Sequence, residues 1–150
     1  MDRRVSELLK HKESEVVSIA SDAFVVEAVH TMMRLRIGSL VVMDGHPQPI
    51  GIVTERDVLR RVVDVGLPPE TTRVADIMSS PPITIAAGTT AVEAMRVMTD
   101  HRVRHLPVIE ENTMVGLISI GDVMKCISEC LEQDIEQLEE YITGAPAMHA

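Results

Sequence analysis

The sequence is nearly devoid of aromatic residues, with one Phe, one Tyr and no Trp in 150 residues. Its core must therefore be filled by aliphatic side chains and by ten methionines, whose flexible thioethers adapt to irregular gaps. The same absence removes the aromatic surface on which single-stranded nucleic acid usually stacks. Basic residues are also in the minority, and the net charge of −9 would repel a phosphate backbone. We therefore expect no nucleic-acid partner.

Long apolar segments and cysteine-rich motifs are missing too. No stretch reaches the ~18 apolar residues of a membrane span, and the N-terminal MDRRVSELLKHKE lacks the apolar part of a signal peptide. We expect a cytoplasmic protein without membrane contact. The two cysteines, Cys126 and Cys130, lie on one face of an expected helix, and we interpret them as small apolar side chains because a metal site would need further ligands.

Familiar catalytic motifs are absent as well. The sequence contains no G-x-x-x-x-G-K-[ST] phosphate loop, no H-E-x-x-H and no G-x-S-x-G. His101 and His105 lie on either side of an expected change from helix to strand, so their spacing does not place them on one helix face. We therefore expect that the protein is not an enzyme.

What the sequence does contain is an internal repeat. Residues 17–44 align without a gap over residues 83–110. After a one-residue deletion in the following turn, Gly51 still falls on Gly116 and Asp57 on Asp122. Chance similarity of hydrophobic pattern would not also keep a glycine and an acid in step, so the chain is internally duplicated.

Each copy has the pattern of a strand, a helix, two strands and a second helix. The strands are expected at residues 16–19, 40–43 and 50–53 of the first copy and at 83–85, 106–109 and 114–118 of the second. A short helix is expected at 74–78. Helical spacing predicts buried faces made by Val25, Val29, Met32 and Met33 in the first copy and by Ala91, Met95 and Met98 in the second.

These patterns predict an α/β (α+β) protein of two β-α-β-β-α repeats. A unit of about 60 residues has a small core and is only marginally stable alone, so we expect the copies to pack sheet to sheet about a pseudo-twofold axis. The expected organisation is an N-terminal helix or arm (1–15), a first repeat (16–65), a linker with a short helix (66–82), a second repeat with an extended C-terminal helix (83–143) and a tail (144–150). Any cleft in one copy should recur in the other.

One motif leads into the second helix of each copy. It consists of a glycine, two aliphatic residues, a hydroxyl, two variable residues and an acid, and the hydroxyl and acid are Thr54 and Asp57 or Ser119 and Asp122. A hydroxyl followed three residues later by an acid is typical of a capping box. Because Asp is shorter than the Glu or Gln that a capping box prefers, and because helix starts attract anions, we favour an additional binding role. An Asp in such a place can accept hydrogen bonds from both ribose hydroxyls.

The stretches G-I-V-T-E-R-D and H-R-V-R-H-L-P-V, the latter followed by G-L-I-S-I-G-D, resemble the CBS domain family, especially its small stand-alone tandem proteins. The resemblance covers almost the whole chain. It implies a disc-shaped pair with two clefts that bind adenine nucleotides, most often AMP and sometimes ADP, ATP, NAD or S-adenosylmethionine. It also implies that Asp57 and Asp122 contact ribose, with hydroxyl contacts from Thr54 and Ser119. The implied adenine contacts are Ser18, Ile37 and Ser39 in one copy and Thr84, Val103 and His105 in the other.

The copies differ where the phosphate of such a ligand would lie. The residues before the middle strand are Arg36, Gly38 and Ser39 in the first copy and Arg102, Arg104 and His105 in the second. Strand alternation would place Arg102 and Arg104 on one side and His105 on the other. Arg104 and His105 are phosphate candidates, since arginine makes charge-assisted contacts, although a solvated rim is the alternative. In the first cleft Arg56 is a further candidate, and Lys12 would reach the same cleft from the arm. We expect clefts of unequal affinity.

The C-terminal helix carries an apolar stripe with spacings of three and four residues, which is made of Ile127, Leu131, Ile135, Leu138 and Ile142. It can pack on its own repeat or form part of a homodimer interface, and we favour the homodimer. The resulting hypothesis is a regulatory module, in signal transduction or energy sensing, that passes nucleotide occupancy to an unidentified protein. The alternative is a ligand-independent dimerisation unit whose motifs serve only as helix caps.

Overall fold

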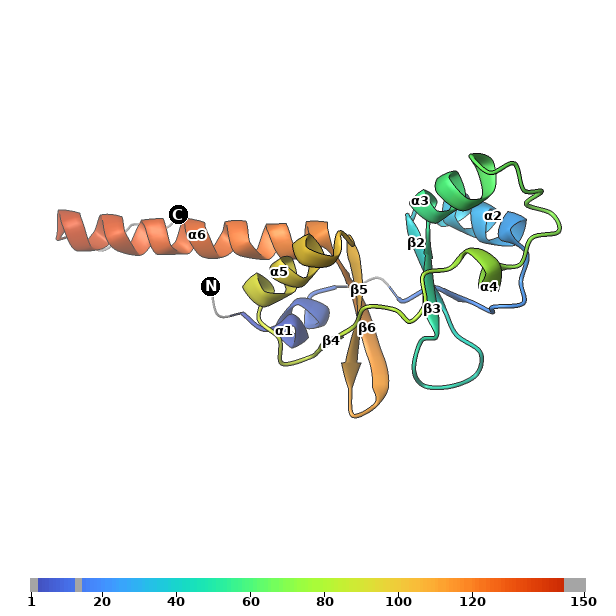
Figure 1. Ribbon diagram of the computed structural model, residues 1–150. Coiled ribbons are helices and arrows are strands. Elements are labelled where there is room, and N and C mark those ends of the chain that lie inside the picture. The colour runs from blue at the N-terminus through green and yellow to red at the C-terminus, as the bar shows by residue number, and fades with distance from the viewer. Residues whose placement is uncertain (1–2, 13–14, 145–150) are drawn as a thin grey trace.

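The computed structural model describes residues 3–12 and 15–144 of the chain. Figure 1 shows two halves side by side, with the long helix α6 extending away from them. The first half and the segments before and after it contain α1 (Val5–Lys10), β1 (Ser18–Ile19), α2 (Val25–Leu35), β2 (Ser39–Val42), β3 (Gly51–Thr54), α3 (Glu55–Val58), the π-helix η1 (Leu59–Val63) and α4 (Val74–Ile77). The second half contains β4 (Ile85–Ala86), α5 (Ala91–His101), β5 (His105–Glu110), β6 (Thr113–Ser119) and α6 (Ile120–Thr143).

Each repeat forms its own three-stranded mixed sheet, in the orders β1-β2-β3 and β4-β5-β6. The first strand of each sheet runs parallel to the second, and the third is antiparallel to it. The predicted β-α-β-β-α order is therefore confirmed in both copies. The first strands are shorter than predicted, because only two residues of each pair with the middle strand.

The first helix of each repeat ends at an arginine in the left-handed conformation. The φ angles are 55° at Arg36 and 54° at Arg102, and the chain turns there toward the middle strand. This turn makes the prediction from strand alternation wrong, because Arg102 caps a helix and the strand begins only at His105.

Each repeat has its own hydrophobic core, which lies between its sheet and its helices. The first contains Val25, Met32 and Leu40 among its buried residues, and the second contains the equivalent Ala91, Met98 and Leu106. The expectation that Met33 is also buried is wrong, since its side chain is 70% exposed. Successive residues of a helix point about 100° apart, and Met32 alone of this pair lies on the core side.

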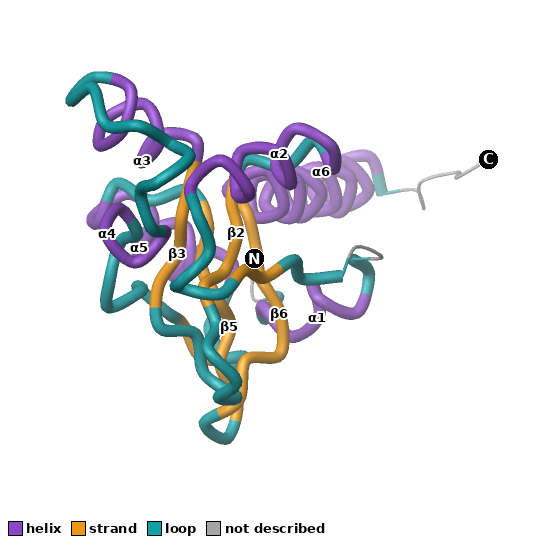
Figure 2. Tube along the Cα trace, turned by 90° about the vertical axis from the view of Figure 1, so that its right-hand side faces the viewer, coloured by secondary structure: helices purple, strands orange, loops and turns teal. Residues whose placement is uncertain are grey.

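The opposite faces of the sheets pack toward each other. Val41 and Ile52 are register partners and are 0% and 7% exposed, yet neither belongs to the helix-side cores. Because side chains alternate along a strand, they lie on the other face of their sheet, toward the strands of the second repeat (Figures 1 and 2). The hairpin of the first repeat also reaches the second, where Met114 N donates to Pro47 O at 2.9 Å. The predicted sheet-to-sheet packing is confirmed.

Each repeat is completed by a segment that precedes the other repeat. The N-terminal helix α1 packs on the second repeat, where Val5 is part of the core and its N–H donates to Thr89 O at 2.8 Å. The linker helix α4 packs on the first repeat in the same way, with Val74 N donating to Ala23 O at 2.8 Å. The N-terminal arm therefore belongs structurally to the second repeat.

The predicted long C-terminal helix is confirmed as α6. Its first turns pack on the second core through Val123, Cys126 and Cys130, and its later turns extend beyond the body of the protein (Figure 1). None of the helices in the described part of the chain combines the length and apolar character needed to cross a bilayer. Of the expected tail 144–150, only Gly144 lies within the described residues, and it caps α6.

Candidate functional site

The two motif hydroxyls each begin a helix. Thr54 Oγ1 accepts from the Asp57 N–H at 3.2 Å, while Asp57 Oδ2 accepts from the Thr54 N–H at 3.0 Å. In the second repeat, Ser119 and Asp122 exchange the same bonds at 3.2 and 2.8 Å. Both capping boxes are complete, so Asp reaches the N-cap amide although it is shorter than the Glu or Gln that such a box prefers. Each acid has a structural role before any ligand is considered.

The first site, defined here as Thr54, Asp57 and Ser79, is held together from two segments. Asp57 is buried, and its second oxygen, Oδ1, accepts a bond of 3.3 Å from the hydroxyl of Ser79 in the linker. A carboxylate has about four acceptor positions. Asp57 Oδ2 also accepts from the Thr54 hydroxyl at 3.1 Å, so three of these positions are occupied. One position remains for a further donor, such as a sugar hydroxyl, while Asp57 caps α3.

The second site, defined here as Ser119, Asp122, Lys12 and His105, contains a cation at the equivalent place. Lys12 Nζ donates to Asp122 Oδ2 at 2.7 Å and to Leu117 O at 2.9 Å. Burial alone would raise the pKa of Asp122, but the bonds from Lys12 and Ser119 outweigh it and lower that pKa. Asp122 is therefore ionised at neutral pH and paired with an ammonium group.

Lys12 lies at a different site from the one expected. Lys12 is predicted from the sequence to lie at the cleft of the first copy, whereas it bonds to Asp122 of the second copy. The cause is the packing of α1 on the second repeat, which carries the arm past β6. A segment that precedes one repeat along the chain thus serves the site of the other.

His105 begins β5 directly opposite Ser119, as Ser39 begins β2 opposite Thr54. Its Nδ1 is buried and has no hydrogen-bond partner among the described residues. Burial, followed by the charge of Lys12, lowers the pKa of His105, although Asp122 and Glu55 act in the opposite direction. His105 is therefore a neutral imidazole at neutral pH, and an acid of each repeat influences its titration. A buried ring nitrogen without a partner is unusual and calls for a ligand or a water.

The other predicted contact residues differ in how far they are exposed to solvent. The carbonyl oxygen of Arg104 accepts from Ile120 N at 2.8 Å, which places its backbone beside the start of α6. Ser39 is buried, whereas the predicted sugar, base or phosphate contacts at Ser18, Arg56, Thr84 and Arg104 are exposed. Ile37 and Val103 are half-buried and pack against the edges of the two cores. Their contacts with a ligand stay predictions.

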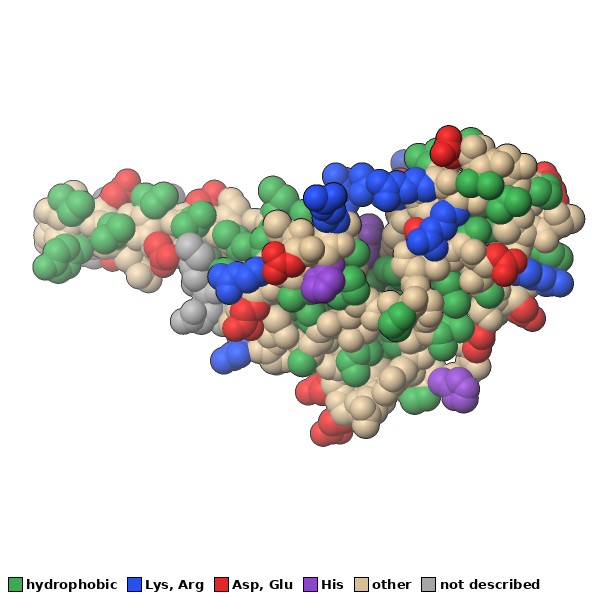
Figure 3. All heavy atoms as spheres, viewed as in Figure 1, with side chains coloured by type: hydrophobic (Ala, Val, Ile, Leu, Met, Phe, Trp, Pro, Cys, Tyr) green, Lys and Arg blue, Asp and Glu red, His purple; other side chains and the backbone are tan. Residues whose placement is uncertain are grey.

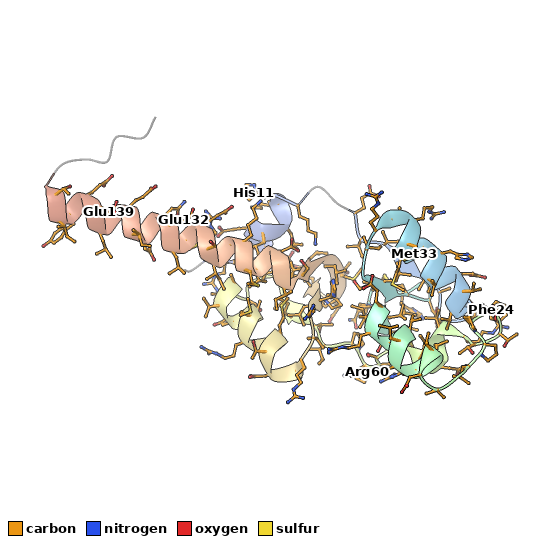
Figure 4. All side chains as sticks on the ribbon, turned by 90° about the horizontal axis from the view of Figure 1, so that it is seen from above. His11, Phe24, Met33, Arg60, Glu132 and Glu139 are labelled. Atoms are coloured by element: carbon orange, nitrogen blue, oxygen red, sulfur yellow. The ribbon has the colours of Figure 1, made fainter. Side chains whose placement is uncertain are left out.

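Basic side chains gather over the junction of the repeats. Figure 3 shows Lys and Arg side chains on both sides of a hollow between the two halves, with a histidine below them. In Figure 4, Arg60 lies on the side of the first repeat that faces the second. Sequence reasoning missed Arg60 and Ser79. The four-residue spacing from Arg56 was the available signal for Arg60, and nothing in the sequence pointed to Ser79.

The motif glycines are explained by the segments that cross them. A Cβ on Gly51 would lie 2.6 Å from Met78 Sδ and 3.0 Å from the Ser79 carbonyl oxygen. On Gly116 it would lie 2.5 Å from Cδ2 of Leu9 in the N-terminal arm. The glycines therefore admit the linker at the first site and the arm at the second. In the described residues no cluster of three His, Cys, Asp or Glu side chains is arranged to hold a metal ion.

Comparison with known proteins gives a consistent result. The CBS domain model matches residues 5–64 and 74–129. A relative from Arabidopsis thaliana, the mitochondrial CBS domain-containing protein CBSX3, is 36% identical over 148 residues, which cover 93% of this chain and 72% of that protein.

Solved structures resemble the chain in fold and in sequence. A CBS-domain protein from Burkholderia ambifaria, named for a suggested role in signal transduction, has a TM-score of 0.79 and 38% identity over 83% of this chain and 93% of that one. A hexameric CBS-CP12 protein from bloom-forming cyanobacteria has a TM-score of 0.73 and 32% identity, covering 83% and 71%. A CBS domain protein from Pyrobaculum aerophilum, solved in complex with AMP, has a TM-score of 0.70 and 31% identity, covering 80% and 89%.

Proposed function

The chain belongs to the CBS domain family as a tandem pair, and from this premise we propose that it is a regulatory module that binds an adenine nucleotide at one or both sites. Stand-alone proteins of this family are generally non-catalytic, and a structural relative binds AMP. The observation that carries the proposal is the pair of equivalent helix starts, each with an ionisable Asp beside a strand end. AMP is the expected ligand.

In the proposed complex, the ribose hydroxyls donate to Asp57 or Asp122. The hydroxyl of Thr54 or Ser119 lies within the same helix turn and can contact the sugar or phosphate. The orphaned Nδ1 of His105 gives the second site a further polar group for a ligand. Exposed Arg56 and Arg104 are the proposed phosphate contacts, since guanidinium groups bind phosphate in charge-assisted pairs.

Isothermal titration calorimetry tests the proposal directly. The chain is titrated with AMP, and then with ADP, ATP, NAD and S-adenosylmethionine, with GMP as a control for the base. We expect AMP to bind with the highest affinity and the two sites to differ. Absence of heat and of any thermal shift with all five adenine compounds would contradict the proposal.

We further propose that the active form is a homodimer in which a second copy covers the late turns of α6. Leu131, Ile135, Leu138 and Ile142 are between 43% and 79% exposed, so they do not pack on their own repeat. The first repeat also exposes Met33 on α2 and Leu59 and Val63 on η1, and these helices carry Arg34, Arg60 and Arg61. A second copy thus offers the acidic helix α6 both apolar contact and opposite charge.

Leu138→Glu tests this interface, with Gln137→Glu as a control that adds the same charge outside the stripe. Light scattering after size exclusion should give a dimer for the parent chain and the control and a monomer for Leu138→Glu. A monomeric parent, or a Leu138→Glu chain that stays dimeric, would contradict the assignment.

The complete capping boxes favour one competing function, a structural unit that needs no ligand. In that case both acids serve only the helix starts, and no adenine compound changes the stability of the chain. The calorimetric series separates the two functions. The expected cytoplasmic location stays a prediction, and the name of the Arabidopsis relative places that protein in mitochondria.

A further inference from the structure

We propose that Lys12 competes with ribose for Asp122, so that the second site accepts phosphorylated nucleotides and discriminates against the uncharged nucleoside. The inference rests on the proposed function, because it concerns the ligand preference of one of the two sites. It assigns to the N-terminal arm a direct role in selecting the ligand.

The geometry that carries this inference is the bond between Lys12 Nζ and Asp122 Oδ2. At 2.7 Å it is the shorter of the two bonds that the ammonium makes, the other being 2.9 Å to Leu117 O. Oδ2 also accepts the Ser119 N–H as part of the cap. A ribose that approaches Asp122 must therefore displace the ammonium or share the carboxylate with it.

The first site differs at this position. Asp57 Oδ1 meets the hydroxyl of Ser79 at 3.3 Å, which is a long bond between a carboxylate and a neutral donor. A hydroxyl can remain beside a bound sugar as donor or acceptor, whereas an ammonium is a donor only. Competition with ribose is therefore expected at the second site and not at the first.

The arm is fixed while the Lys12 side chain can move. Backbone bonds from Val5 to Thr89 and from Ser6 to Ala87 hold α1 on the second repeat, and Leu9 packs over Gly116. A cavity of about 610 Å³ adjoins the Lys12–Asp122 pair between α1 and α6. The flexible four-carbon stem of lysine can thus swing aside without unfolding the arm.

Phosphate changes the balance of this exchange. Displacing Lys12 by a nucleoside breaks an ion pair, and the nucleoside brings no anion to replace the carboxylate. A nucleotide breaks the same pair but brings a phosphate, which the displaced ammonium can bind as a charged partner. Because the side chains are 26% and 31% exposed, the pair is a weak competitor, and its loss corresponds to a change of about three- to fivefold in affinity.

The experiment compares adenosine with AMP at the second site alone. Asp57→Ala removes the ribose acceptor of the first site, and Lys12→Met is added to remove the ammonium while keeping the chain length. Lys10→Met is the matched control, because Lys10 is exposed at the end of α1, two residues before Lys12. Binding is measured by calorimetry, and thermal unfolding checks that every variant is folded.

We expect Lys12→Met to raise the affinity for adenosine about three- to fivefold and to leave the affinity for AMP equal or lower, whereas Lys10→Met changes neither. An unchanged adenosine affinity in Lys12→Met, or an equal gain for adenosine and AMP, overturns the inference. If Asp57→Ala binds neither compound while the parent chain binds AMP, the second site is not a nucleotide site and the inference fails alone. If the parent binds no adenine compound, the proposed function fails with it.

Discussion

The two repeats share one backbone plan but surround their equivalent acids with different groups. Asp57 is buried beside the hydroxyl of Ser79, whereas Asp122 is partly exposed and paired with the ammonium of Lys12. Both partners come from the segments that cross the motif glycines, namely the linker and the N-terminal arm. The crossing segments lie outside the duplicated sequence, and they determine whether the partner of each acid is neutral or charged.

The helix starts differ in charge as well. Helix α3 begins with Glu55 and Arg56, where α6 begins with Ile120 and Gly121. The second helix of the first repeat changes into a π-helix after four residues and ends at Val63, while α6 continues to Thr143. Single π-helical turns are rare and occur often at functional sites. The duplication thus preserves the capping motif while the two second helices have diverged in length and charge.

Replacing a motif glycine by alanine should cause the largest loss of stability, and the loss should be larger in the first repeat than in the second. Gly51→Ala would bring Cβ to 3.0 Å from the Ser79 carbonyl oxygen, whereas the nearest neighbours of a Cβ at Gly116 all belong to the flexible Leu9 side chain. Backbone yields less readily than a side-chain end, so we expect losses of about 3 kcal/mol for Gly51→Ala and about 1 kcal/mol for Gly116→Ala. Urea unfolding measures both. Equal losses would mean that the linker and the arm are held with the same rigidity.

Replacing Asp57 should lower the nucleotide affinity of the first site more than it lowers the free energy of unfolding. Asp57→Ala removes a charged acceptor for ribose, which should cost about 2 kcal/mol of nucleotide binding at the first site, or about thirtyfold in affinity. It also removes the reciprocal cap bond, which should lower the free energy of unfolding by about 1 kcal/mol. Calorimetry and urea unfolding measure the two quantities separately.

Asp57→Asn is the matched control for this prediction. Its amide oxygen can still accept from the Thr54 N–H, so we expect most of the stability to return while the affinity stays low. A nucleotide affinity that is unchanged in Asp57→Ala would remove Asp57 from the site and leave the cap as its only role.

The duplication and the order of elements could be predicted because Gly51, Asp57 and their counterparts keep their spacing across the two copies. The packing of the N-terminal arm on the second repeat could not be predicted, because the repeat pattern does not indicate on which copy a flanking segment packs. An Arg-Val pair begins both equivalent helices, at residues 4–5 and 73–74, but the same pair also occurs at 61–62, 96–97 and 102–103, so it gives no specific signal. Without knowledge of that packing, Lys12 was predicted at the wrong site and Ser79 was missed.

The burial of individual side chains was also only partly predictable. Helical spacing cannot distinguish Met32 from Met33 at the edge of an apolar face, although one is buried and the other exposed. Capping geometry likewise depends on the turn between strand and helix, which allows the shorter Asp to reach the N-cap amide in both copies.

Replacing His105 of the second repeat by serine, its counterpart in the first repeat, should change how the stability of the protein depends on pH. Burial lowers the pKa of His105 below its ordinary value of 6.5, so the unfolded chain binds this proton more readily than the folded one. The folded state therefore loses stability as the pH falls below about 6.5. His105→Ser, which copies Ser39, should flatten the loss between about pH 7 and pH 5. Thermal unfolding across this range tests it, with exposed His30→Ser as control; an unchanged profile would show that His105 is not responsible.

The smallest expected effect concerns the ion pair that distinguishes the second site. The pKa of Asp122 is held below its ordinary value of 3.8, so this carboxylate stabilises the folded state above that pH, and the contribution is lost as the pH falls through the lowered pKa. Because both partners are partly exposed, the pair contributes at most about 1 kcal/mol, and less at high salt. Lys12→Met should therefore lower the unfolding midpoint in urea slightly at neutral pH.

The difference between the parent chain and Lys12→Met should shrink as the pH falls below 3.8 and through the lowered pKa of Asp122, where the carboxylate becomes protonated. It should also shrink at neutral pH when about 1 M salt is added. Lys10→Met should show neither dependence, since its side chain is exposed and the ion pair of Asp122 is made by Lys12. A stability difference that persists at low pH and high salt would mean that Lys12 stabilises the arm through the packing of its aliphatic stem. The contrast between the ammonium at the second site and the hydroxyl at the first would then be steric and not electrostatic.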